Sequence, residues 1–123
     1  LIGDAAGAPD PTSGLGTSLV FRDVRELRDL LLSEREWDAA LAAFAVRRCR
    51  YYAVVRAYDR WMNQLLAEEG SEADRRRERH ARAREQDPTL GGFAAIEAQG
   101  PDGLVPDDRA RRHFFGEDLA DAN

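Results

Sequence analysis

The feature that most constrains this chain is a long amphipathic pattern between about Glu34 and Glu69. Its apolar residues recur at the spacing of one face of an α-helix. Ser33 and Glu36 match a capping box in front of it, and Gly70 stands where glycine commonly follows a helix. The expected apolar stripe consists of Trp37, Leu41, Phe44, Tyr52, Val55, Met62 and Leu66. We therefore expect one long helix that other parts of the protein must cover.

The rest of the chain after residue 16 also reads as helical, so the expected fold class is mainly α. Helix-starting residues, turn residues and apolar spacing divide it into short elements. These are a helix carrying Val20, Val24, Leu27 and Leu31, a polar helix from Ser71 to about Gln86, a segment "TLGGFAAIEAQ" after Asp87 and Pro88, a turn at 100–103, and a last helix from Pro106 to about Phe115, after which the chain frays.

The N-terminal stretch "LIGDAAGAPDPTSGLGTSL" differs from everything that follows it. Leu1 and Ile2, followed by Gly3, look like the end of a strand, and a loop rich in Gly, Pro and Asp comes next. A lone strand cannot satisfy its backbone hydrogen bonds without partners. Because the sequence also lacks an initial methionine, we expect a strand remnant here, with the sheet that completes it lying upstream in a longer protein.

Composition narrows the class of protein. Hydrophobic residues make up 43% and charged residues 33% of the 123 positions, which favours a folded, water-soluble chain. No apolar run approaches the ~20 residues of a membrane-spanning helix, and a net charge of −5 argues against general nucleic-acid binding. With Cys49 as the single cysteine and only two histidines, we expect a cytoplasmic protein without a structural zinc site.

The N-terminal loop has residues suited to holding a ligand. Asp4 would follow the strand at the carboxyl edge of a sheet, where α/β proteins bind ligands. Gly14 and Gly16 leave the backbone bare where a helix begins, and such an end favours negative charge. Pro11 stiffens the loop between the strand end and the helix. A ligand with hydroxyls at one end and a partly anionic group at the other would suit this loop, and a flavin nucleotide has both.

The whole string, G-D-A-A, four residues, P, two residues and G-x-G before an amphipathic helix, resembles the second FAD-binding segment of FAD-dependent aromatic-ring hydroxylases of the p-hydroxybenzoate hydroxylase type. The match runs from Leu1 to about Leu32. It departs at Gly7, where many members have His, and at Ser18, where many have Asn. The resemblance implies that Gly3 permits close approach beside Asp4, Asp4 binds the ribityl chain, Pro11 lies by the isoalloxazine ring, and Gly14, Leu15, Gly16, Thr17 and Ser18 contact the pyrimidine edge.

This resemblance implies a flavoprotein monooxygenase that uses FAD, NAD(P)H and O2 to oxidise a small organic substrate. The parent enzyme would have a Rossmann-like α/β FAD-binding fold. Its other FAD-binding and substrate regions would lie upstream in the same chain, so that the fragment alone is inactive. Residues 1–33 would form the second FAD-binding motif and residues 34–123 a C-terminal helical region. The alternative is a small, self-contained helical interaction module without catalysis.

Other conspicuous residues favour structural roles. We expect Asp23 to be a helix-surface or capping partner rather than a flavin ligand, and the run Arg75–Arg84 to be a solvated helix face rather than a phosphate-binding patch. His80 lies in that run and should be exposed, whereas His113 and Cys49 should pack. The aromatic residues favour a core or an interface over substrate or base contacts: Trp37, Phe44, Tyr51, Tyr52, Tyr58 and Trp61.

Overall fold

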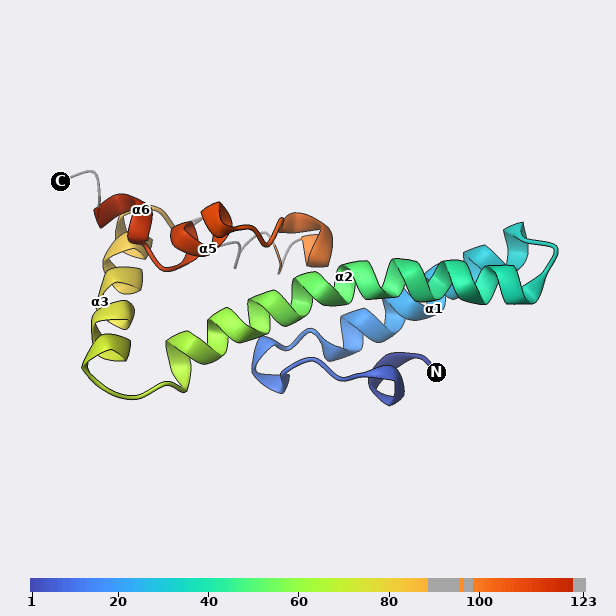
Figure 1. Cartoon of the computed structure of the whole chain (residues 1–123), viewed down its shortest axis with the longest axis horizontal. Coiled ribbons are helices and arrows are strands. Elements are labelled where there is room, and N and C mark those ends of the chain that lie inside the picture. Colours follow the sequence, from blue (N-terminus) through green and yellow to red (C-terminus); the bar gives the residue numbers. More distant parts are fainter. Residues whose placement is uncertain (89–95, 97–98, 121–123) are drawn as a thin grey trace. The chain divides into compact units, whose positions relative to one another are not determined.

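A computed structural model of the chain describes residues 1–88, 96 and 99–120. Figure 1 shows helices following one another along the chain, and the described part contains no strand. The mainly α fold is thus confirmed. The elements are η1 (Gly3–Ala6), η2 (Pro11–Ser13), α1 (Gly16–Ser33), α2 (Trp37–Leu66), α3 (Ser71–Gln86), η4 (Gly100–Gly103), α5 (Asp108–Phe114) and α6 (Glu117–Ala120), where η denotes a 3-10 helix.

The expected strand end at Leu1 and Ile2 is not formed in the described part of the chain. Ile2 has extended backbone angles, with φ −134° and ψ 166°, but Gly3 already begins the 3-10 helix η1. A strand needs a neighbour that accepts and donates its backbone hydrogen bonds, and none of the described residues offers one. The extended conformation therefore ends after a single residue.

The capping box expected at Ser33 is wrong, because α1 ends at this residue. The Ser33 hydroxyl donates to the Leu30 carbonyl at 3.2 Å, within the helix that it closes. The long helix α2 begins at Trp37 instead, and the amide of Ala40 donates to the Glu36 carbonyl. A short hydroxyl side chain can bond the last turn of one helix as readily as the first turn of the next, so the motif was ambiguous.

The chain divides into two compact units, Leu1–Arg56 and Ala57–Asn123, and α2 passes from the first into the second. In the first unit, α1 packs against the early turns of α2. Buried Leu30, Ala40 and Phe44 form its apolar cluster, with Leu27 and Leu31 beside them. Trp37 and Leu41, which belong to the expected stripe, are 75% and 49% exposed. Only part of that stripe is therefore covered by α1.

In the second unit, aromatic side chains form the core. Phe114 is fully buried and meets Tyr58 edge to face, with ring centroids 6.2 Å apart, and Phe115 at 5.0 Å. His80, expected to be exposed, is buried against the Phe114 ring, and its Nδ1 lies 2.6 Å from the Phe114 carbonyl. Since a carbonyl only accepts, Nδ1 carries the proton. His80 thereby joins α3 to α5 by both packing and hydrogen bonding.

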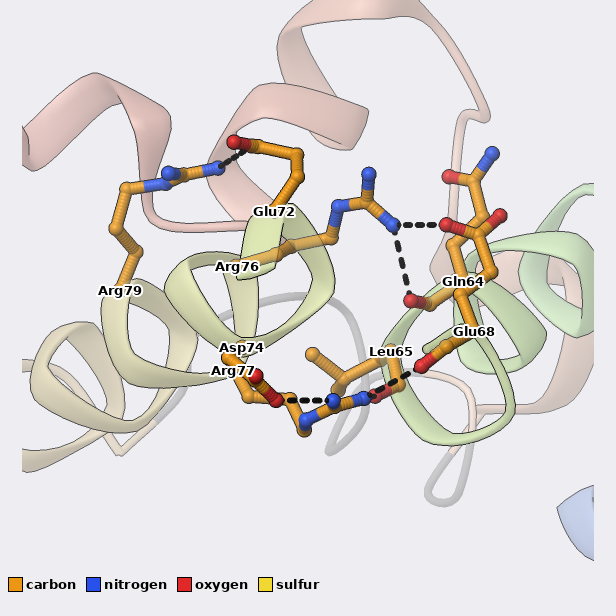
Figure 2. A network of polar contacts seen from close by, with 8 residues as sticks. All are labelled: Gln64, Leu65, Glu68, Glu72, Asp74, Arg76, Arg77 and Arg79. Carbon is orange, nitrogen blue, oxygen red and sulfur yellow. Dashed lines mark hydrogen bonds and ion pairs between the residues drawn. The ribbon is translucent and has the colours of Figure 1, made fainter. Parts of the chain in front are cut away.

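The arginine run on α3 binds the C-terminal end of α2. Arg76 donates to the Gln64 carbonyl at 3.0 Å, and Arg77 donates to the carbonyls of Leu65 and Glu68 at 3.1 and 2.9 Å (Figure 2). The last carbonyls of a helix lack partners within it and carry partial negative charge. These arginines supply both the missing donors and the opposite charge. The expectation of a merely solvated face is thus wrong for Arg76 and Arg77.

The end of the chain is not frayed as expected, at least as far as α6. Gly116 has φ +67° and lies against α3, so that an added Cβ would fall 2.7 Å from the Ala83 Cβ and 2.9 Å from the Arg79 carbonyl oxygen. Only glycine fits such an approach at this backbone angle. Of the expected segment 89–99, residues 89–95, 97 and 98 lie outside the described residues.

Replacing Gly116 by alanine should destabilise the chain strongly. The left-handed backbone costs alanine ~1–2 kcal/mol, and the clash with α3 should add ~1–3 kcal/mol. Gly100→Ala is the matched control, because Gly100 has φ +65° and an added Cβ meets nothing within 4 Å. Urea unfolding followed by circular dichroism measures both variants. Equal losses of stability would contradict the close approach of Gly116 to α3.

The free energy of unfolding should fall as the pH drops below about 6.5. Burial lowers the pKa of His80, as does the charge of Arg84, while the bond to Phe114 opposes them. As the pH falls, His80 is therefore protonated at a higher pH in the unfolded chain than in the folded chain. Acid then favours the unfolded state until His80 is protonated in the folded state as well. Denaturant unfolding at pH 7.5 and 5.5 measures the change in the free energy of unfolding. This change should be smaller for His80→Gln than for the control His113→Gln, which replaces a half-exposed histidine.

Candidate functional site

The candidate site is the N-terminal loop and the first turn of α1, both in the first unit. Gly3 is buried with φ +58°, and an added Cβ would lie 3.0 Å from a methyl carbon of Val20. Through this contact η1 packs against α1, one turn after the N-terminus of α1. The structure thus places Gly3 at a close approach, but the approach is to α1.

Asp4 lies on the outer side of this short helix. Its side chain is exposed, while its carbonyl accepts from the Gly7 amide at 3.0 Å and closes the turn. The backbone on either side of Asp4 is bonded to the helices, as described below. An exposed carboxylate on a fixed backbone can accept hydrogen bonds from hydroxyl groups without rearranging the loop.

The segment from Pro11 to Gly14 forms a second, independently stabilised turn. Asp10 caps η2 by accepting from the Thr12 amide at 2.8 Å, and its carbonyl accepts from the Ser13 hydroxyl at 2.8 Å. Gly14 has φ +66°, and an added Cβ would meet nothing within 4 Å. Pro11, Thr12 and Gly14 are exposed. The turn explains why glycine occupies position 14, and it leaves the space beside that residue open.

The N-terminus of α1 has no side-chain cap. Leu15 precedes the helix in a right-handed helical conformation and makes no capping bond, and the first turn has no acidic residue. Gly16, Thr17 and Ser18 are therefore the residues whose amides lack a partner within the helix. This is an arrangement that suits a partly anionic acceptor.

A buried polar cluster fastens the loop to the two helices. The Asp23 carboxylate is completely buried. It accepts from the Gly3 amide at 2.7 Å, from Arg48 Nε at 3.0 Å and from the Tyr51 hydroxyl. Asp23 is thus not the helix-surface residue we expected, although its role is structural as expected.

Arg48 extends this cluster to the loop carbonyls. Its guanidinium donates to Gly3 O at 3.0 Å, to Ala6 O at 3.2 Å and to Gly7 O at 3.4 Å, and it stacks over the Tyr52 ring at 3.7 Å. The local sequence pattern does not indicate this role for Arg48 or Tyr51. The only available signal was their spacing on the long helix, which places residues three apart on one face.

Burial and pairing fix the ionisation states in the cluster. Burial raises the pKa of Tyr51, and its hydrogen bond to Asp23 raises it further, so Tyr51 remains a donor. Burial lowers the pKa of Arg48, but the bond to Asp23 and the charge of Asp23 outweigh it and raise the pKa. The result is a neutralised ion pair inside the protein, with Asp4 as the exposed charge nearby.

Other features do not contribute to this site. Cys49, expected to pack, is exposed. The apolar cavity of about 400 Å³ found in this unit is lined by residues such as Ile2, Leu41 and Phe44, and by none of the predicted FAD contacts. Within the residues described, no three His, Cys, Asp or Glu side chains gather as metal ligands, and no helix is long and apolar enough to cross a membrane.

The described residues fit the flavin nucleotide implied by the resemblance in three respects. Open space adjoins Gly14, the first amides of α1 have no partner within the helix and no side-chain cap from Leu15, and Asp4 presents an exposed carboxylate. No protein-family model matches the chain, and neither a curated protein nor a solved structure shows a significant match to it.

Replacing Asp23 by alanine should unfold or severely destabilise the first unit. It would leave Arg48 buried without its counter-charge, and breaking a buried pair costs ~3–5 kcal/mol. Asp29→Ala on the same helix is the matched control, because Asp29 pairs with Arg28 at the surface and should cost at most ~1 kcal/mol. Chemical denaturation measures both. A loss below 1 kcal/mol for Asp23→Ala would contradict the buried cluster.

Proposed function

We propose that this chain is the FAD-contacting C-terminal segment of a flavin-dependent oxidoreductase of the aromatic-ring hydroxylase type. The observation that carries the proposal is the pairing of an exposed Asp4 on a fixed loop with an uncapped helix N-terminus that begins at Gly16 and follows Gly14. The sequence motif supplies these residues in register. The exposure of Asp4 and the open space beside Gly14 support the proposal.

In this proposal each group has one task. Asp4 accepts hydrogen bonds from the ribityl hydroxyls. The amides at the start of α1 donate to the pyrimidine edge of the ring, where negative charge is favoured by ~0.3–1 kcal/mol or more. Pro11 lies beside the ring and stiffens the turn. When bound, FAD supplies the redox chemistry, with NAD(P)H as reductant and O2 as oxidant of a small organic substrate.

The rest of the enzyme belongs to the proposal as well. The upstream part of the same protein would contribute a Rossmann-like FAD-binding fold and the substrate-binding region. The whole protein would act in the cytoplasm. The chain alone would neither retain FAD nor turn over.

Gly16 offers a test that separates binding from folding. Its φ is not positive, and an added Cβ would meet only Pro9 Cγ at 3.9 Å, an ordinary contact. The fold of this chain therefore does not require glycine at position 16. A flavin ring packed against the backbone would require it, because a side chain would occupy the space of the ring.

In the complete gene product, Asp4→Ala and Gly16→Leu should both weaken FAD binding. Loss of a hydrogen bond to a charged group costs ~1.5–3 kcal/mol, which corresponds to about a tenfold to hundredfold weaker Kd for Asp4→Ala. Flavin content after purification and FAD titration of the apoprotein measure the effect, and Arg75→Ala on the exposed face of α3 is the control. Equal flavin content in the parent protein and both variants would refute the proposal. A gene product without flavin whose 123 residues unfold cooperatively on their own would favour the interaction module.

A further inference from the structure

We infer that Asp23, Arg48 and Tyr51 form a positioning unit that sets the place of the Asp4 carboxylate for a polyhydroxyl chain. The inference rests on the proposed function and adds Arg48 and Tyr51, which lie outside the matching stretch from Leu1 to about Leu32. By itself, η1 is held by few hydrogen bonds. This helix has four residues and one closing bond, from the Gly7 amide to the Asp4 carbonyl at 3.0 Å.

The bonds that fix this loop come from the two long helices. On the side before Asp4, the Gly3 amide donates to Asp23 of α1, and the Gly3 carbonyl accepts from Arg48 of α2. On the side after Asp4, the carbonyl of Ala6 accepts from the same guanidinium. The backbone that carries Asp4 is therefore held at both ends, while its carboxylate stays exposed.

An arginine is needed at position 48 because its donors point in several directions at once. Nε bonds Asp23 while the two terminal nitrogens bond the loop carbonyls. A lysine would keep the positive charge opposite Asp23, but its single ammonium cannot bond all these acceptors in the same geometry. Arg48→Lys should therefore preserve the buried ion pair and loosen the loop.

Tyr51 orients the carboxylate to which the other residues bind. Its hydroxyl donates to Asp23, and its ring lies under the Arg22 guanidinium at 4.5 Å. Tyr51→Phe retains the ring and removes only the hydroxyl. Because the remaining Asp23 oxygen keeps its bonds to Gly3 and Arg48, this variant perturbs the unit more mildly than Arg48→Lys.

The test is a double-mutant cycle on FAD binding in the complete gene product, with variants Arg48→Lys, Asp4→Ala and the two combined. Apoprotein is titrated with FAD, and flavin fluorescence and visible circular dichroism are recorded. Arg47→Lys is the matched control, since Arg47 is the adjacent residue on α2 and pairs with Glu26 at the surface. Thermal unfolding is measured in parallel, and Tyr51→Phe replaces Arg48→Lys if the latter does not fold.

A positioning role predicts that Arg48→Lys weakens FAD binding about tenfold, the effect of losing one or two net hydrogen bonds. The combined variant should then bind FAD no more weakly than Asp4→Ala alone, because the arginine acts through Asp4. Arg47→Lys should match the parent protein, and the dichroism of the bound flavin should change in Arg48→Lys.

Two results would overturn the inference while leaving the proposed function intact. One is an unchanged affinity in Arg48→Lys when Asp4→Ala binds weakly. The other is a combined loss equal to the product of the single losses, which would mean that Arg48 acts independently of Asp4. An unchanged affinity in Asp4→Ala itself would instead refute the assignment of Asp4 in the proposed function.

Discussion

The first unit depends on a carboxylate that has no access to water. Asp23 is 0% exposed, and an ionised group in such a place is tolerated only when opposite charge and hydrogen bonds replace its hydration. Arg48 supplies the charge, while Gly3 and Tyr51 supply further bonds. Since these partners come from η1 and α2, satisfying one carboxylate on α1 brings three segments of the chain together.

The second unit satisfies its polar groups differently. The carbonyls at the end of α2 accept hydrogen bonds from the arginines of α3, and the Phe114 carbonyl at the end of α5 accepts one from His80 Nδ1. In both cases a helix C-terminus is completed by a side chain from another helix. These contacts fix how neighbouring helices join without a separate capping sequence, and they leave the aromatic side chains to fill the interior.

The sequence predicted helices well and their partners poorly. Apolar spacing and the Ser71–Gln86 pattern are local properties, so α3 has the expected bounds. Burial of Asp23 and His80 depends on partners 20 to 34 positions away, and burial of Gly116 depends on the neighbouring helix α3. Local pattern contains no such information, and a charged or polar residue is exposed by default. The loop glycines were found because a turn and a bare helix start are themselves local features.

The glycines of the loop separate what the fold needs from what a ligand would need. Gly3 is explained by its left-handed backbone and the contact with Val20, and Gly14 by its left-handed backbone alone. Gly16 has neither constraint, and glycine is a poor residue in a helix compared with alanine, by roughly 0.5–1 kcal/mol in its interior. At Gly16, a helix start without a cap, the proposed ligand packed against the backbone would account for a glycine that the fold does not require. Gly16 therefore supports the ligand-binding proposal independently of the charge on Asp4.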